Sequence, residues 1–139
     1  MYTANKRQEF AKKAFEYVKE VKNEHKDVEG KYLSYVKKFP VMIKTNGLLA
    51  ALSFEYAKSN GDNWKENGGE KKAHGLLLNH IARFWGYEND ESSNFQLIKD
   101  MVKWDSLTVI RKTDEIINLL NWMRRFAEGM LKEEKKNDS

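Results

Sequence analysis

The side chains in this sequence best suited to act on a partner are basic ones, gathered around Pro40 and along the last third of the chain. They are Lys37, Lys38, Lys44, Arg111, Lys112, Arg124 and Arg125, and Asn46 adds a hydrogen-bonding group near the first cluster. Lysine and arginine bind the phosphates of nucleic acids through their charge. If the segments that carry these residues pack together, they would form one positive face suited to an RNA or DNA backbone.

The same residues have a simpler explanation, because surfaces on which lysine alternates with glutamate are usually only solvated. Trp122 and Phe126, which interleave with Arg124 and Arg125, fit a packed core better than a base-stacking surface. The net charge of +4 and the pI near 9.1 suit an anionic partner without a histone-like excess. From the residues alone, a helical adaptor that binds only protein is favoured over nucleic-acid binding.

Metal chemistry finds little support in the sequence. The three histidines are His25, His74 and His80, and the spacing of the last two does not place them on adjacent turns of one helix face. His80 falls on an apolar stripe, which is typical of a hydrogen-bonded core histidine. Cysteine is absent, which excludes disulfides and thiolate ligands. We therefore predict no metal site and no cofactor.

No catalytic residue is predicted either. The carboxylates alternate with lysines, and the pair Asp114-Glu115 is explained by the dipole at a helix start. Asn67-Gly68-Gly69 lacks the Lys-Ser/Thr that completes a phosphate-binding loop, and no serine or threonine sits in a nucleophile elbow. A nuclease without a recognisable motif stays open as an alternative for experiment.

The elements that must position these residues are helices, since apolar residues recur at helical spacing throughout and no alternating strand pattern competes. The sequence predicts an all-α fold, a single compact bundle of about six helices over residues 1–139, with a frayed tail at about 133–139. The expected helices cover approximately residues 3–23, 27–38, 40–59, 70–87, 92–102 and 113–132.

Pro40 predicts a sharp corner between the second and third helices, because proline suits a first helical turn and pushes Phe39 out of helical geometry. The nearly uncharged run of residues 39–54 is expected to be the central buried helix. Gly47 within it indicates either close packing of a neighbour or a break at Asn46-Gly47, and the sequence does not choose between them.

Three other segments carry specific expectations. Trp64 lies in the long polar loop 59–69 and is expected to pack back on the body as an anchor. The helix after Ser92 or Ser93 is expected to bury Phe95, Ile98, Met101 and Val102. Residues 104–110 are expected to form a turn and a helical fragment before Thr113 opens the last helix.

The compartment follows from two observations. The first residues are charged and lack the apolar core of a signal peptide, and no window is apolar over the length needed to cross a bilayer. The absence of cysteine agrees with a reducing environment. We expect a cytoplasmic protein without membrane contact.

Two blocks of the sequence resemble a known family. The first covers residues 31–54 and contains Phe39-Pro40-Val41-Met42-Ile43-Lys44-Thr45-Asn46-Gly47-Leu48. The second covers residues 113–128 and contains Leu119-Leu120-Asn121-Trp122-Met123-Arg124-Arg125-Phe126. Together, in this order and in a chain of this length, they resemble the small helical subunit of type III-B CRISPR effector complexes, the Cmr family.

The resemblance implies a non-catalytic, all-α subunit present in several copies, stacked head to tail beside a backbone of larger subunits. The implied partners are other Cmr subunits, especially the backbone subunit, further copies of this chain, and guide RNA and target RNA. The stack would line the groove in which the two RNAs pair. The basic residues would then touch phosphates without reading bases, because base pairing with the guide selects the sequence.

Overall fold

A computed structural model describes residues 2–134, with Asp62 described by its backbone only, and this part of the chain is helical without any strand. The elements are α1 (Ala4–Glu24), a 3₁₀ turn (Lys26–Val28), α2 (Glu29–Asn46), α3 (Leu48–Ser59), a second 3₁₀ turn (Gly61–Asn63), α4 (Trp64–Asn67), α5 (Gly69–Phe84), α6 (Ser93–Met101) and α7 (Ser106–Met130). The all-α prediction is confirmed. Six longer helices match the expected number, and the four-residue α4 is additional.

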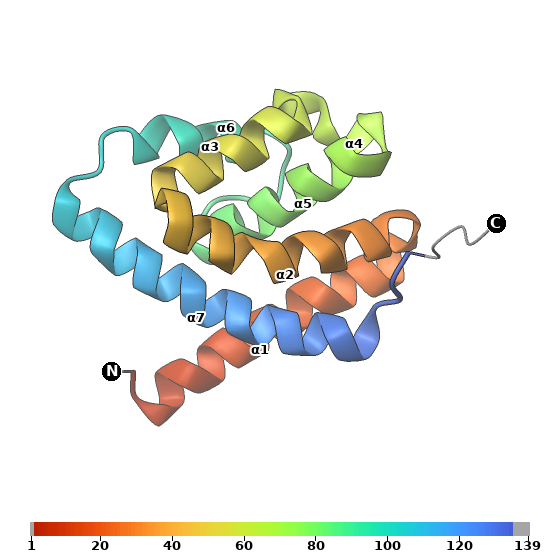
Figure 1. Ribbon diagram of the computed structural model, residues 1–139, viewed down its shortest axis with the longest axis horizontal. Coiled ribbons are helices and arrows are strands. Elements are labelled where there is room, and N and C mark those ends of the chain that lie inside the picture. Colours follow the sequence, from red (N-terminus) through yellow and green to blue (C-terminus); the bar gives the residue numbers. More distant parts are fainter. Residues whose placement is uncertain (1, 135–139) are drawn as a thin grey trace.

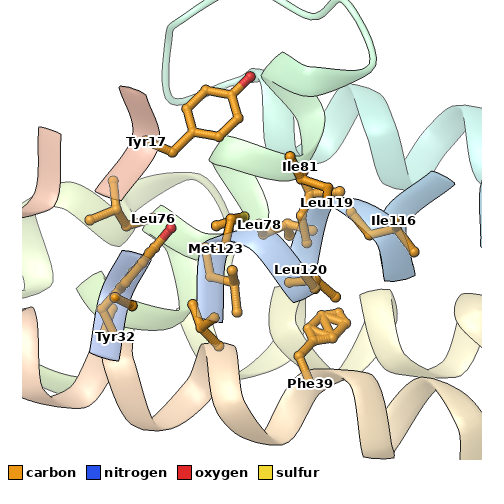
Figure 2. Close-up of a cluster of buried hydrophobic side chains, with 14 of the residues drawn as sticks. Tyr17, Tyr32, Phe39, Leu76, Leu78, Ile81, Ile116, Leu119, Leu120 and Met123 are labelled. Atoms are coloured by element: carbon orange, nitrogen blue, oxygen red, sulfur yellow. The ribbon is translucent and has the colours of Figure 1, made fainter. Parts of the chain in front are cut away.

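The helices are arranged around α5 (Figure 1). On one side, α2 lies alongside α7, and α7 crosses α1; on the other, α3, α4 and α6 pack against α5. Every residue of α5 from 73 to 82 is buried. Figure 2 shows how α2, α5 and α7 meet in the core, where Phe39 lies under Leu120.

The central buried helix is therefore α5, and the prediction that residues 39–54 would hold this place is wrong. Within α3, Leu48, Ala51 and Leu52 face the core, while Ala50 and Phe54 are exposed. Polar residues inside α5 concealed its position, because they interrupt its apolar run although all of them find partners in the interior. The pattern of apolar residues alone could not reveal that these polar residues of α5 pair with side chains of other helices.

The predicted corner at Pro40 is also wrong, because α2 continues through Pro40 to Asn46. Proline fixes φ at a helical value and removes only one backbone donor, and Phe39 and Ile43 on either side are buried, which holds the helix together. The chain breaks instead at Gly47, whose φ of 86° lies in the region that favours glycine. Of the two alternatives left open, the break at Asn46-Gly47 is confirmed.

The last helix begins earlier than predicted. Asp105 caps α7, since its side chain accepts a hydrogen bond from the backbone N–H of Thr108 at 2.8 Å. Thr113, the expected start, lies inside the helix, and its hydroxyl donates to the carbonyl of Val109 at 2.7 Å. The expected fragment at 104–110 is therefore largely part of one continuous helix. The sequence did not reveal this because apolar residues in the first turns of α7 are exposed and obscure the helical spacing of the buried ones.

The buried side of α6 differs from the expected one. Leu97 and Met101 are buried, whereas Phe95 and Val102 are exposed. Of the expected apolar set, Ile98 is half-buried and Met101 lies in the core. The error arose because a nine-residue helix holds too few apolar residues for the pattern to distinguish its two sides.

Trp64 packs back on the body as predicted. Its side chain is fully buried, and it rests directly on the backbone of Gly75 in α5. A Cβ atom at Gly75 would lie 2.3 Å from Trp64, which leaves no room for any side chain. The close approach of these two residues fixes the loop 59–69 against α5.

The chain after α7 folds back along α2. The backbone N–H of Lys132 donates to Glu29 Oε1 at 2.8 Å, and Lys31 pairs with Glu134. Of the predicted frayed tail, residues 135–139 lie outside the described residues.

Replacing Gly75 by alanine should lower the free energy of unfolding by about 1 to 3 kcal/mol, because the new methyl group overlaps Trp64. Gly129→Ala is the matched control, since nothing lies within 4 Å of a Cβ at that position and alanine favours the helix. Urea unfolding followed by circular dichroism measures both. Equal stability of the two variants would contradict the close contact between Trp64 and Gly75.

Candidate nucleic-acid interface

All eight predicted contact residues lie on two neighbouring helices. Lys37, Lys38, Lys44 and Asn46 belong to α2, and Arg111, Lys112, Arg124 and Arg125 belong to α7. These helices pack against each other along the side of the molecule remote from α4 and α6 (Figure 1). Packing thus brings together two groups that are far apart in sequence.

Lys37 and Arg124 lie near one another at the seam between α2 and α7, but both have acidic neighbours. Arg124 Nε donates to Glu128 Oε1 at 2.7 Å, and Lys37 Nζ lies 4.0 Å from Glu133. The hydrogen bond from Arg124 and the charges of Arg124 and Lys37 lower the pKa of Glu128. Both cations are therefore partly compensated within the chain.

Lys38, Lys44 and Arg111 are exposed and form no ion pair with the part of the chain that the structure describes. Asn46 is exposed at the end of α2. Lys44 lies seven residues after Lys37, which places both on one stripe of the helix. These positions offer exposed charge or hydrogen-bonding groups to a partner, and the charge of Arg111 also lowers the pKa of Asp105.

Lys112 and Arg125 are engaged with aromatic rings. Lys112 Nζ lies 4.8 Å from the ring centre of Trp85 and 5.4 Å from that of Trp104, and its partial burial lowers its pKa. The guanidinium of Arg125 lies 5.3 Å from the ring centre of Trp122. The structure thus separates Lys112 from the other candidates, because its amine lies over Trp85, directly after α5, and Trp104, before α7.

Trp122 and Phe126 pack against the core rather than forming an open stacking surface. Their rings stack with centres 6.0 Å apart, and Phe126 meets Phe15 of α1 edge-on at 5.6 Å. This confirms the packing interpretation of the two aromatic residues. They join α7 to α1.

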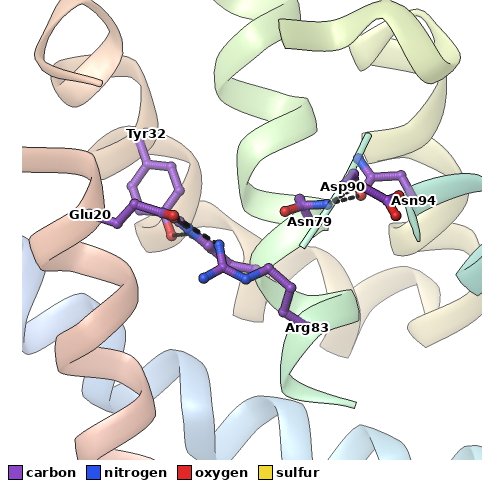
Figure 3. Close-up of polar contacts among 7 residues, drawn as sticks. Glu20, Tyr32, Asn79, Arg83, Asp90 and Asn94 are labelled. Atoms are coloured by element: carbon purple, nitrogen blue, oxygen red, sulfur yellow. Dashed lines mark hydrogen bonds and ion pairs between the residues drawn. The ribbon is translucent and has the colours of Figure 1, made fainter. Parts of the chain in front are cut away.

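A cluster of polar side chains in the interior links α1, α2 and α5 (Figure 3). His80 is fully buried, its Nδ1 lies 2.6 Å from the hydroxyl of Tyr32, and its Nε2 contacts Glu20. Arg83 Nη1 donates to both oxygens of Glu20 at 3.0 and 2.9 Å. Carboxylate, imidazole and phenol resemble a proton relay, but no substrate could reach the enclosed His80. The prediction of a hydrogen-bonded core histidine is confirmed.

The carboxylate of Glu20 is held ionised. Partial burial opposes ionisation, but the hydrogen bond from His80 and the guanidinium of Arg83 lower the pKa of Glu20 to about 2. Burial lowers the pKa of His80. Both directions favour a neutral imidazole beside a charged carboxylate that Arg83 neutralises.

One group of possible metal ligands was not anticipated. Ligand atoms of Glu20, Glu24 and His25 lie within 4.8 Å of one another. Glu20 is already bound by Arg83 and His80, and burial together with the nearby charge of Lys72 lowers the pKa of His25. A cation would compete with Arg83 and meet the charge of Lys72, so the arrangement favours an ion-pair network.

Sequence reasoning missed one cluster altogether, which lies beside Lys38. It joins Tyr35 of α2 and Lys58 of α3 to the buried pair Glu55 and His74. These residues come from three helices and have no common spacing. Only the glutamate in a largely apolar helix could have signalled them, because a buried carboxylate needs a partner.

The chain is similar to known proteins over most of its length. Residues 6–130 match the model of the family described as CRISPR-associated protein (Cas_Cmr5). The CRISPR system Cmr subunit Cmr5 of Thermus thermophilus is 30% identical over 127 residues, which cover 91% of this chain and 96% of that protein. A crystal structure of a CRISPR-associated Cmr5 family protein from the same organism superposes with a TM-score of 0.71 at 29% identity, over 95% of this chain and all of that one.

Within residues 2–134, no helix combines the length and the apolar character that crossing a bilayer requires.

Glu20→Gln should lower the free energy of unfolding by about 1 to 3 kcal/mol at pH 6 to 7, because it removes the charge that Arg83 and His80 stabilise. The folded pKa of Glu20, about 2, lies below its ordinary value of 4.5. The contribution of the Glu20 charge to the free energy of unfolding is therefore complete above pH 4.5 and is lost as the pH falls toward 2. The difference from wild type, measured by chemical unfolding at several pH values, should shrink over this interval.

The control is Glu16→Gln, which removes an exposed glutamate from the same helix. It should differ little from wild type at any pH. A constant difference for Glu20→Gln between about pH 6 and 3 would contradict the ionised carboxylate.

Proposed function

The chain belongs to the Cas_Cmr5 family of CRISPR-associated proteins, and from this premise we propose that it is the non-catalytic small subunit of a type III-B Cmr complex. In this proposal it is a single cytoplasmic domain that stacks in several copies beside the backbone subunit. The stack lines the groove that holds guide RNA and target RNA. Its partners are the other Cmr subunits, further copies of itself and the two RNAs.

The observation that carries the RNA contact is the placement of Lys38, Lys44 and Arg111. All three are exposed on the adjacent helices α2 and α7, and none of them forms an ion pair in the described part of the chain. Exposed cations outside ion pairs on neighbouring helices suit a phosphate backbone, and such contacts position RNA without reading its sequence.

The other candidates take lesser parts in this proposal. Arg124 binds Glu128, and Lys37 lies near Glu133 and lowers the pKa of Glu128, so an RNA phosphate would have to displace an acidic neighbour. Arg125 lies on Trp122, and Lys112 on Trp85 and Trp104. Asn46 would add a neutral hydrogen bond at the end of α2.

A chain with a net charge of only +4 should bind RNA weakly on its own. When several copies line one groove, each later contact becomes intramolecular and gains from a high effective concentration. The proposal thus assigns RNA binding to the array rather than to the single chain.

A second function, protein–protein adaptor without nucleic-acid contact, has its own supporting observation. Leu107 and Ile110 on one face of α7, together with Val41 and Val102, are large apolar side chains that are well exposed. Exposed apolar surface of this kind marks protein contacts. In the main proposal the same surface would contact other subunits of the complex.

The experiment that tests the assembly is purification of the tagged chain from its native host, with mass spectrometry of bound protein and sequencing of bound RNA. Recovery of Cmr subunits with short guide RNAs is expected. Recovery of unrelated proteins without RNA would overturn the proposal. RNA degradation by the purified chain in magnesium or manganese would instead support a nuclease.

Lys44→Glu combined with Arg111→Glu should weaken binding of target RNA by the assembled complex. The slope of log K against log salt should fall by about 0.7 for each lost single-strand phosphate contact. The control Lys12→Glu with Lys13→Glu makes the same change in charge on the exposed face of α1 and should have less effect. Equal losses of RNA binding in the two double variants would show that only the net charge matters and would contradict a specific contact. If neither double variant changed RNA binding, the protein–protein adaptor would be favoured.

A further inference from the structure

A cleft of about 290 Å³ lies among α2, α3 and α5, next to the contact candidate Lys38. Its volume is just below the range for small-molecule sites, about 300 to 1,000 Å³, and suits a group the size of one nucleobase. Its rim carries Lys38 and Lys58, with Glu70 as an opposing charge. The proposed function makes no use of this cleft.

The floor of the cleft is a buried ionisable pair. Glu55 is 2% exposed and His74 is 8% exposed, and His74 Nδ1 lies 2.6 Å from Glu55 Oε2. Burial raises the pKa of Glu55, against the effect of the hydrogen bond from His74. Glu55 Oε1 and His74 Nε2 have no hydrogen-bond partner among the described residues. Two buried polar side chains thus retain unused hydrogen-bonding capacity where they line the cleft.

The walls of the cleft are aromatic. Tyr35 stacks on His74 with ring centres 3.8 Å apart and planes at 9°, and Phe54 meets His74 edge-on at 6.1 Å. Phe54 is 40% exposed, and Lys58 Nζ lies 5.5 Å from its ring centre. Aromatic faces beside lysines are the combination that binds single-stranded nucleic acid, where bases stack and cations hold the backbone.

We propose that this cleft holds one unstacked nucleobase of single-stranded RNA, packed against Phe54, with the adjoining phosphate at Lys38 and Lys58. The inference rests on the proposed function and deepens it, because it adds a base contact to the phosphate contacts. Hydrogen-bond chemistry selects the base. In its ionised form a carboxylate only accepts hydrogen bonds, so Glu55 favours a base with an exocyclic amino group, as in cytosine, adenine and guanine. Uracil presents carbonyl oxygens on both sides of its one N–H and suits Glu55 less well.

The test uses the full-length chain at low salt with the hexamers C6, A6 and U6, followed by NMR chemical shifts. C6 and A6 should perturb signals of Phe54 and His74 and bind several-fold more tightly than U6. Phe54→Ala should weaken binding of all three by about 5- to 100-fold, the range expected for the loss of one stacked base. Phe15→Ala is the matched control, because Phe15 is 42% exposed on α1, away from the cleft, and should leave binding unchanged.

Glu55→Gln tests the base preference separately. Its amide oxygen can still accept from His74, so the fold is retained, but its amide nitrogen donates and the preference for C6 over U6 should disappear. Circular dichroism confirms folding of each variant. Equal binding of C6 and U6 by wild type, equal effects of Phe54→Ala and Phe15→Ala, or no shift at Phe54 and His74 at millimolar nucleotide would each overturn the cleft proposal.

The outcomes separate this inference from the proposed function. If the cleft variants bind like wild type while the tagged chain still recovers Cmr subunits and guide RNA, only the nucleobase site is refuted. If the tagged chain recovers neither, the proposed function fails whatever the hexamers show.

Discussion

The structure depends on the pairing of polar side chains inside a helix that is buried on its whole circumference. Burying an unpaired polar group costs several kcal/mol, so His74, Asn79 and His80 of α5 each need a partner in the interior. Each finds it on a different helix. His74 meets Glu55 of α3, Asn79 donates to Asn94 of α6 at 3.1 Å, and His80 contacts Tyr32 of α2 and Glu20 of α1. Figure 3 shows two of these connections.

These pairs set the register in which the other helices lie on α5. Apolar packing tolerates sliding and exchange of similar side chains, whereas a buried hydrogen bond is satisfied in only one arrangement. Asn94 extends the connection, because its amide also donates to the carbonyl of Gly75 at 2.9 Å, where Trp64 rests. Fixing α2 against α5 also fixes the rim on which Lys38 and Tyr35 lie. The surface that we propose for RNA is therefore placed by contacts in the interior.

The sequence predicted those parts of the fold that depend on local periodicity. The buried face of α1, with Phe10, Tyr17 and Val21, follows from spacing, and Thr3, where the expected helix begins, caps that helix. The central position of α5 and the continuation of α2 through Pro40 depend on contacts between distant segments, which local rules do not contain. For the candidate site, the basic residues are visible in the sequence because charge is a local property. Whether an acidic neighbour compensates that charge, as for Arg124, is decided by the fold.

The two proposed kinds of RNA contact differ in what they demand of the fold. Phosphate contacts at Lys44 and Arg111 need only exposed charge, and long side chains adjust to a backbone at small cost. A base contact needs a preformed cleft, and the buried pair Glu55 and His74 supplies one whose floor cannot move without breaking a hydrogen bond in the core. The same interior pairing that sets the helix register would thus give a weakly charged subunit a contact that depends on the base. This contact would add to the base pairing between guide and target, which selects the sequence.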